Sequence, residues 1–304
     1  MPTYPTYSVN GTPLQDSAGR WHEHPETQIL PVHSGLRSTA VELNALDGEY
    51  LVGRSPLEAK DFTIKLVINA VDEKGVRPKA FNDQLIQMYK NLQTLYQAFK
   101  LPRMTGNGRA ELKLHLSSSR VLTAQGLLVA STSIDRDDYA DYATVTFVFR
   151  LPDPKWRGKT VTERIDTSLE PMGWKGLISG LADSTASVND ALVTLAGPFE
   201  RITVVNEYGD GFSYNKKLTE GQAVTVNTRN WSASEPFNIE VNAADVSPST
   251  GKYTYSPALE QVGQSSATAL VLWPQDGGAV IYSNGAGRTP GKTCIYVRTR
   301  EAYL

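Results

Sequence analysis

The residues that could carry out chemistry are few in this chain, and they do not form a recognisable catalytic set. Catalysis needs acids, bases, nucleophiles or metal ligands that converge on one point. The four histidines of the 304 residues are His22, His24, His33 and His115. The pair His22 and His24 superficially resembles a metal clasp, but no second cluster of ligands accompanies it. A solvated or interfacial loop is therefore favoured for this pair, and a surface position for His115 on the polar side of an alternating strand.

Two segments imitate motifs of nucleophilic catalysis and of phosphate binding. In Gly176-Leu177-Ile178-Ser179-Gly180 the serine is one position away from the centre of a nucleophile elbow, and no strand pattern precedes it. In Gly285–Thr293 the Gly291-Lys292 pair resembles a phosphate loop, but Ala286 occupies the position of the first required glycine. A strand pattern rather than a helix follows. We interpret the second segment as a β-turn and expect no nucleophile at Ser179.

Acidic residues and the single cysteine give no stronger signal. The cluster Asp135-Arg136-Asp137-Asp138, with Asp141, could supply oxygen ligands to calcium, but it lacks the glycine and the glutamate of an EF-hand loop. It is typical of a turn between two strands. No pair of carboxylates stands out for glycoside hydrolysis. Cys294 lies in an apolar run, which indicates a buried side chain. The sequence predicts no catalytic residue, no metal ligand and no cofactor, so we expect a protein that is not an enzyme.

Composition and charge narrow the class of protein further. The chain has a mass of 33.3 kDa and a mean hydropathy of -0.32, with 40% hydrophobic and 20% charged residues, as in folded globular proteins. No run approaches the ~18 apolar residues of a membrane span. The net charge is -2, and basic residues are scattered singly apart from Lys216-Lys217, so a groove for nucleic acid is not expected. The start, Met1 to Pro5, lacks the pattern of a secretory signal, and export by that route is not expected.

Period-two alternation dominates the first half and predicts an antiparallel sheet. The clearest strands are Asp61–Ala70, Ala110–Leu116 and Tyr142–Leu151. One segment, Phe81–Phe99, instead spaces its apolar residues by three and four and predicts an amphipathic helix over about residues 82–99. Asn82 or Asp83 is expected to cap this helix. Its polar face, on which we place Asp83, Lys90, Asn91 and Gln97, is nearly neutral, so the apolar face is expected to pack on a sheet.

A shift in composition predicts a domain junction after residue 151. Prolines and glycine follow that position, and Gly176–Asn189 is rich in small residues. We expect a first domain over residues 1–155, a linker over 156–190 and a β-sandwich over 191–304. The strands expected after the linker are Glu200–Asn206, Phe212–Lys216, Gln222–Thr228, Phe237–Val241, Ala267–Trp273, Ala279–Ser283 and Thr293–Thr299.

The second half resembles a known family in the order and spacing of its motifs. Gly197-Pro198 precedes a strand, the turn Gly209-Asp210-Gly211 follows, and Leu218–Arg229 is similar to a glycine-bearing hairpin of siphophage distal tail proteins. The chain also closes on Val297–Leu304, an arginine-bearing strand followed by Glu-Ala-Tyr-Leu, as in that family. Asn227 stands where the family more often has aspartate.

The resemblance implies a mainly β fold, with a tail-tube-like first domain and a galectin-like β-sandwich as the second. It implies a structural protein of the virion, at the tail tip or baseplate of a long-tailed bacteriophage and assembled in the host cytoplasm. Such proteins form a ring, here expected to be a hexamer, that joins the tail tube protein to tail-tip proteins and possibly to the tape measure protein. No membrane partner and no sequence-specific nucleic-acid partner are implied.

Two rival functions and one structural hypothesis remain open. The second domain could be a carbohydrate-binding module for attachment to the host surface, with Trp231 or Trp273 as the stacking residue. The chain could instead hydrolyse cell-wall glycans, although no residue favours this. The segment Gly48–Lys60, which carries Arg54 and Glu58, is expected to be an arm with a polar rim that reaches a neighbouring subunit.

Overall fold

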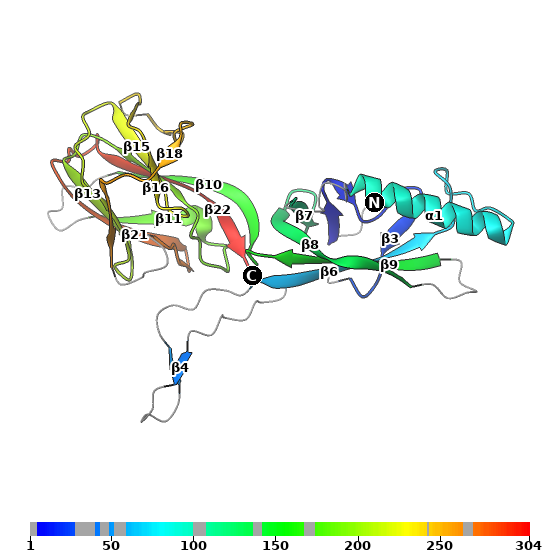
Figure 1. Ribbon diagram of the computed structural model, residues 1–304. Helices are drawn as coiled ribbons and strands as arrows, with labels where there is room; N and C mark the ends of the chain where they lie inside the picture. The colour runs from blue at the N-terminus through cyan, green and yellow to red at the C-terminus, as the bar shows by residue number, and fades with distance from the viewer. Residues whose placement is uncertain are drawn as a thin grey trace. The chain divides into compact units, whose positions relative to one another are not determined.

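The computed structural model describes residues 5–27, 40–42, 49–51, 59–99, 108–135, 142–166, 174–241, 243–263 and 270–304. The chain divides into two compact units, residues 1–158 with Leu304 and residues 159–303 (Figure 1). Strands dominate both units and pair in antiparallel fashion, so the expected mainly β fold is confirmed. Among the described residues, no helix is both long and apolar enough to span a bilayer.

The first unit is built on one antiparallel sheet. Its strands lie in the order β3-β6-β9-β8-β7-β1-β2. Their bounds are β1 (Thr6–Val9), β2 (Thr12–Pro13), β3 (Trp21–Glu23), β6 (Lys60–Asn69), β7 (Ala110–His115), β8 (Val121–Asp135) and β9 (Tyr142–Leu151). A separate two-stranded hairpin joins β4 (Ala40–Glu42) to β5 (Glu49–Leu51). The three strands expected in this half are confirmed as β6, β7 and β9.

Alternation places one face of this sheet in the core. β6 and β9 pair over their whole lengths, from Lys60 opposite Leu151 to Asn69 opposite Tyr142. Phe62, Ile64, Leu66 and Ile68 of β6 and the odd-numbered residues of β9 are buried on one face. At one end of that face the aromatic rings of Tyr7, Phe62 and Trp156 pack against one another, with centroids 5.1 to 6.0 Å apart. This aromatic cluster links β1 to β6 across the core.

The helix α1 (Phe81–Ala98) covers part of the same sheet, as the apolar spacing predicts (Figure 1). Its start corrects one expectation. Neither Asn82 nor Asp83 caps the helix, because the N-cap residue is Ala80, which makes no side-chain capping bond, and Asp83 lies within the first turn. There its negative charge faces the positive end of the helix dipole.

Asn91 is the second correction on this helix, because it is 2% exposed rather than part of the solvated face. Its amide nitrogen donates to the carbonyl oxygens of Asn69 at 2.8 Å and Val71 at 2.7 Å, and its oxygen accepts from Gln87 at 2.9 Å. A buried amide is tolerated when its polar atoms are bonded. Asn91 thus ties α1 to the end of β6.

The second unit contains two antiparallel sheets. The strands of one sheet follow the order β18-β16-β15-β12-β22-β10, and those of the other follow β11-β21-β13-β14-β19. In the first, β10 (Trp156–Asp166) begins in the first unit, and the others are β12 (Leu192–Ala196), β15 (Gln222–Asn227), β16 (Ser232–Ser234), β18 (Tyr253–Thr254) and β22 (Cys294–Tyr303). The second holds β11 (Trp174–Ile178), β13 (Arg201–Asn206), β14 (Gly211–Tyr214), β19 (Leu259–Val262) and β21 (Gly278–Ala286). Short strands β17 (Phe237–Asn238) and β20 (Pro274–Gln275) pair with β15 and β21.

The range expected to be a linker, 156–190, instead contains β10, β11 and the 3-10 turn η1 (Ser179–Leu181). Its glycines serve close packing rather than flexibility. A Cβ atom on Gly176 would lie 2.5 Å from the side chain of Ile165. A Cβ atom on Gly180 would meet the side chain of Val161 even more closely. Glycine is therefore required where β11 and η1 approach β10.

Candidate assembly surface

The histidines that the sequence offers as metal ligands make hydrogen bonds within the fold. His22 lies on β3, where Nδ1 is 3.2 Å from the amide nitrogen of Asn69. Burial, with the nearby His24, lowers the pKa of His22, so its neutral form is favoured. The Nδ1 atom of His24 accepts a hydrogen bond from the backbone of Glu26 at 3.1 Å. In the part of the chain that the structure describes, no three histidine, cysteine or acidic side chains gather as a metal site would need.

Ser179 and the glycine-rich segment have local structural roles. The Ser179 hydroxyl donates to the carboxylate of Glu163, which also accepts from the backbone of Gly180 at 3.3 Å. This carboxylate anchors η1 to β10. The β-turn expected at the glycine-rich segment is confirmed, because a turn leads directly into β22. The Nζ atom of Lys292 is 2.9 Å from the carboxylate of Glu220, so its charge is paired within the fold.

The remaining candidates are dispersed. Cys294 is buried as expected, and burial raises the pKa of its thiol. Asp135 ends β8, while the acidic residues at 137, 138 and 141 lie outside the described residues. Trp231 adopts a left-handed backbone with φ of 53°. Trp273 packs edge-on against Tyr208, with ring centroids 6.1 Å apart.

The expected arm is described only in part. Its first half contains β5, which pairs with β4, and Lys60 begins β6. Arg54 and Glu58 lie outside the described residues. The arm's contact with a neighbouring subunit stays a prediction.

The feature best suited to assembly is an edge of β6 that other described strands cover only in part. Along one side, β6 pairs with β9 over its full length. Along the other, β3 covers only Leu66 to Ile68. The carbonyl of Lys65 accepts from the backbone of His24 at 2.9 Å, and its N–H donates to the Thr27 hydroxyl at 3.1 Å. No described strand pairs with residues 60–64 beyond that point.

The hydrogen-bonding direction of this open edge follows from strand geometry. In a strand, the N–H and C=O of one residue point to the same side, and the direction alternates along the chain. Lys65 and Asn69 both bond toward β3, as the bond from the Asn69 N–H to the Arg20 carbonyl at 2.9 Å shows. The backbone groups of Asp61 and Thr63 therefore point to the same open side. They form a template to which another strand can add.

A second open edge lies on β8. Residues 127–135 pair with β9 along one side, with irregularities after Leu128 and after Ala130. β7 pairs with β8 only up to Gly126. No described strand covers the other side of residues 127–135. Bulges of this kind are common at sheet edges, where they limit uncontrolled pairing.

The two open edges suit a head-to-tail contact between copies. β6 and β8 are both antiparallel to β9, so they run parallel to each other. Residues 60–64 of β6 pair with Leu151 to Phe147 of β9, and residues 128–135 of β8 pair with Phe149 to Thr144. The two open edges therefore lie on opposite sides of β9 and share part of the same stretch along it. A rotation between copies about one axis preserves strand direction and would pair β8 of one copy with β6 of the next in parallel. Such a contact is heterologous, and it gives a ring where the rotation closes and an open filament where it does not.

The face of the sheet opposite α1 is mostly polar, although Val67 of β6 and Val148 of β9 also lie on it. Asp61, Thr63 and Lys65 alternate on β6 with the buried residues, and Thr146 and Arg150 do so on β9. Asp61 and Arg150 form an exposed ion pair at 3.8 Å.

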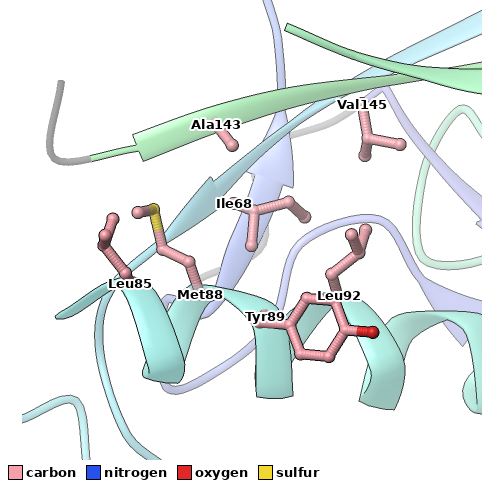
Figure 2. Close-up of a pocket in the computed structure, with 7 residues that line it drawn as sticks. All are labelled: Ile68, Leu85, Met88, Tyr89, Leu92, Ala143 and Val145. Carbon is pink, nitrogen blue, oxygen red and sulfur yellow. The ribbon is translucent and has the colours of Figure 1, made fainter. Parts of the chain in front are cut away.

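The helix side of the sheet carries a small apolar groove between α1, β6 and β9 (Figure 2). Its cavity volume is about 140 Å³, and it is lined by Ile68, Leu85, Met88, Tyr89, Leu92, Ala143 and Val145. Tyr89 forms its rim and is 63% exposed. Exposed Ile86 lies three residues before it on the helix. Tyr89 and Ile86 belong to the apolar face of the helix that was expected to be buried on the sheet. The helix therefore leaves part of its apolar face exposed.

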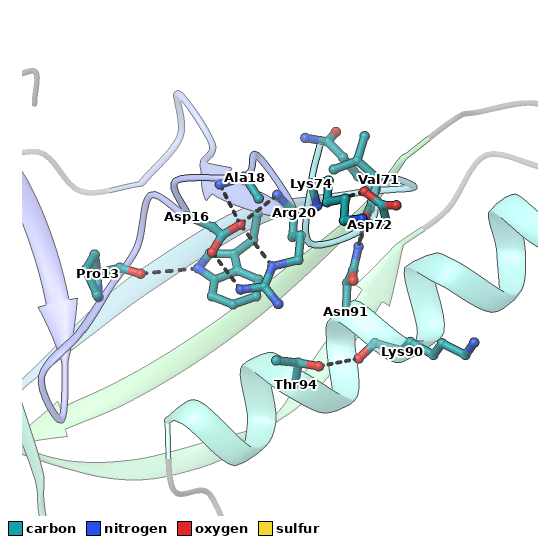
Figure 3. A network of polar contacts seen from close by, with 12 residues as sticks. Pro13, Asp16, Ala18, Arg20, Val71, Asp72, Lys74, Lys90, Asn91 and Thr94 are labelled. Carbon is teal, nitrogen blue, oxygen red and sulfur yellow. Dashed lines mark hydrogen bonds and ion pairs between the residues drawn. The ribbon is translucent and has the colours of Figure 1, made fainter. Parts of the chain in front are cut away.

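A polar network fixes the turn that precedes β3 and so sets where β3 begins on β6, with Trp21 opposite Ile68 (Figure 3). The Arg20 guanidinium donates twice to the carboxylate of Asp16, at 3.0 and 2.9 Å. That side-chain bond lowers the pKa of Asp16. The Trp21 indole N–H donates to the carbonyl of Pro13 at 3.2 Å. The Asp-x-x-x-Arg spacing of Asp16 and Arg20 is the signal in the sequence that could have indicated this network.

The fold defined by these units is that of the phage Dit proteins. The crystal structure of the Dit protein of phage SPP1 superposes with a TM-score of 0.58 at 12% identity, covering 99% of this chain and all of that one. That protein is described as a paradigm of the hub adsorption apparatus in phages that infect Gram-positive hosts. Structures of the phage p2 baseplate in its activated conformation, with Sr and with Ca, match 94% of this chain at 8% identity and a TM-score of 0.36. No protein-family model matches the sequence, and no curated protein sequence matches it.

Proposed function

We propose that this chain is a structural protein of a bacteriophage tail tip, a distal tail protein that forms a ring and joins the tail tube to the tip. The observation that carries the proposal is the pair of open edges on β6 and β8, on a chain that shares its fold over its full length with a Dit protein. Parallel addition of β6 to β8 of the next copy joins one sheet to another without any active site. An assembly role of this kind needs no cofactor.

The hexameric state is part of the same proposal. In a closed ring every open edge is covered, which removes a liability for aggregation. The polar faces of the sheets then line a central channel, and the two rims of the ring are free to contact the tail tube protein on one side and tail-tip proteins or the tape measure protein on the other. The virion tail is the location that follows.

Native mass spectrometry combined with electron microscopy of the purified chain tests this proposal. We expect one closed species of six copies, which images as an annulus and grows at the expense of the monomer as the concentration rises. Closed rings form cooperatively, so open trimers and tetramers are expected to be scarce. A chain that stays monomeric at the highest soluble concentration, or that stops at a two-fold dimer, would contradict ring formation.

A further inference from the structure

One flank of α1 is apolar, and the described residues of the chain leave it partly exposed. Phe81, Leu85 and Tyr89 are spaced by four residues, so their side chains follow one another along the helix. Beside them lies the groove of about 140 Å³, which Ala143 and Val145 of β9 line on the other side (Figure 2). A cavity of about 150 Å³ with apolar walls can hold a group as large as benzene. The groove therefore has room for one apolar side chain.

The opposite flank of α1 faces a turn that follows β6, residues 72–76. Asp72 and Lys74 line a polar groove there together with Thr94 of the helix (Figure 3). The Asp72 carboxylate accepts the backbone N–H groups of Lys74 and Val76, both at 2.8 Å, and the Asp72 N–H donates to the Val76 carbonyl at 2.9 Å. The Val76 backbone is thus held at two points, while its branched side chain, with few rotamers, is 59% exposed.

The groove and Val76 lie on opposite sides of the first unit and at the same end of β6. The groove includes β9, whereas the turn packs against the residue Ala18 that precedes β3, because a Cβ atom on Gly75 would lie 3.2 Å from its carbonyl oxygen. β3 and β9 pair with opposite edges of β6. Ile68 lines the groove, and the turn begins shortly after β6 ends at Asn69, so the two features share one level along the strand.

We propose that Val76 of one copy inserts into the α1 groove of a neighbouring copy. This inference rests on the proposed head-to-tail ring. The open edge of β8 lies beyond β9, and the open edge of β6 lies on the β3 side, so pairing of these edges brings the groove side of one copy against the turn side of the next. The contact extends the pairing of residues 60–64 toward the other end of β6. It is heterologous, because each copy inserts one valine and receives another.

Val76 is the side chain that suits this groove on the turn side. Among the described residues of the first unit, every other large apolar side chain that is exposed lies on α1, β8 or β9. A polar side chain would lose its hydration in a groove with apolar walls and find no hydrogen-bond partner there. Burial of a valine side chain, by contrast, is favourable on both surfaces of the contact.

Charge substitutions, followed by native mass spectrometry over a range of concentrations, test this contact. Val76→Lys and Tyr89→Glu are each expected to raise the concentration at which half of the chains are in rings by at least about tenfold, because each places a charge in an apolar contact. The double variant is expected to assemble better than either single variant, since the new charges attract each other between copies. The two residues lie on opposite flanks of α1, so this rescue cannot arise within one chain.

Val241→Lys is the matched control, because Val241 is an exposed valine of the second unit, at 42%, and should tolerate the same change without loss of assembly. Val76→Ala removes the apolar group without adding a charge, and it should weaken assembly in the same direction. Circular dichroism of each variant excludes misfolding.

The outcomes distinguish this contact from the proposed function. Weakening by both single charges, with rescue in the double variant, supports the contact. Rings that form from Val76→Lys or Tyr89→Glu chains at the wild-type concentration overturn the contact and leave ring formation intact. Effects that merely add in the double variant overturn it as well. A wild-type chain that forms no ring contradicts the proposed function and the contact together.

Discussion

The variant Thr63→Pro is expected to abolish self-assembly and to leave the first unit folded. The backbone N–H of Thr63 points to the open side of β6, so proline there removes no bond to β9. It does remove a donor from the edge that we propose to pair with β8 of the next copy. Proline also places its ring on that edge and blocks the approach of a strand. Because the loss recurs at every contact of a ring, we expect the closed species to disappear at concentrations where the wild-type chain is fully assembled.

Thr63→Val provides the matched control. Valine keeps the backbone N–H, fits a strand as well as threonine does, and changes only the half-exposed side chain. We expect this variant to assemble like the wild type in native mass spectrometry. Equal assembly of the proline and valine variants would show that the β6 edge is not the contact. Loss of the cooperative thermal transition in Thr63→Pro alone would instead point to a bond with β9 at this position.

The second large effect is expected for Trp156→Ala, which should destabilise the first unit by about 3–5 kcal/mol. Trp156 is 1% exposed and packs edge-on against Phe62, with ring centroids 5.6 Å apart. Truncation leaves a cavity lined by the rings of Tyr7 and Phe62, which the sheet cannot close. A domain is stable by about 5–15 kcal/mol in total, so the loss is a large fraction.

Urea denaturation followed by circular dichroism measures the free energy of unfolding of this variant. Trp156→Phe is the control, and it is expected to lose clearly less because it keeps an aromatic ring in the cluster. The exposed Ile86 on α1 offers a second comparison, since Ile86→Ala should change stability by about 0.5 kcal/mol or less. A loss below about 1 kcal/mol in Trp156→Ala would mean that the aromatic cluster does not hold the core of the first unit.

Alternation made the long strands predictable, because a period of two identifies a strand with one buried face. β6 and β9 follow their expected spans within one residue, and the helix begins one residue earlier than expected. The short strands β1, β3 and β12 were not foreseen, since three to five residues carry too little periodicity to stand out. β10 and β11 were not predicted, because glycines and other small residues in this range suggest a flexible linker. In the structure these glycines are tightly packed against neighbouring side chains.

The sequence predicts that the sheet has exposed edges, but it does not predict which strands form them. A protein rich in antiparallel strands must have edges, but which edges stay open depends on where β3 and β7 end. Thr27 and Gly126 mark those limits, and neither residue type signals such a role in sequence. The burial of Asn91 likewise depends on the position of carbonyl groups at the end of β6, which no local pattern encodes.

Disulfide trapping between two variants that each carry one added cysteine tests most directly whether the edges of β6 and β8 meet. Thr63 pairs with Val148 on one side of β9, and Val129 lies beside Ala130, the partner of Val148 on the other side. The native Cys294 is 3% exposed and should stay silent. When Thr63→Cys and Val129→Cys chains are mixed under mild oxidation, we predict a linked dimer that contains one chain of each kind. Neither variant alone should give it. Linked dimers from each variant alone, or none in the mixture above that background, would contradict head-to-tail pairing of these strands.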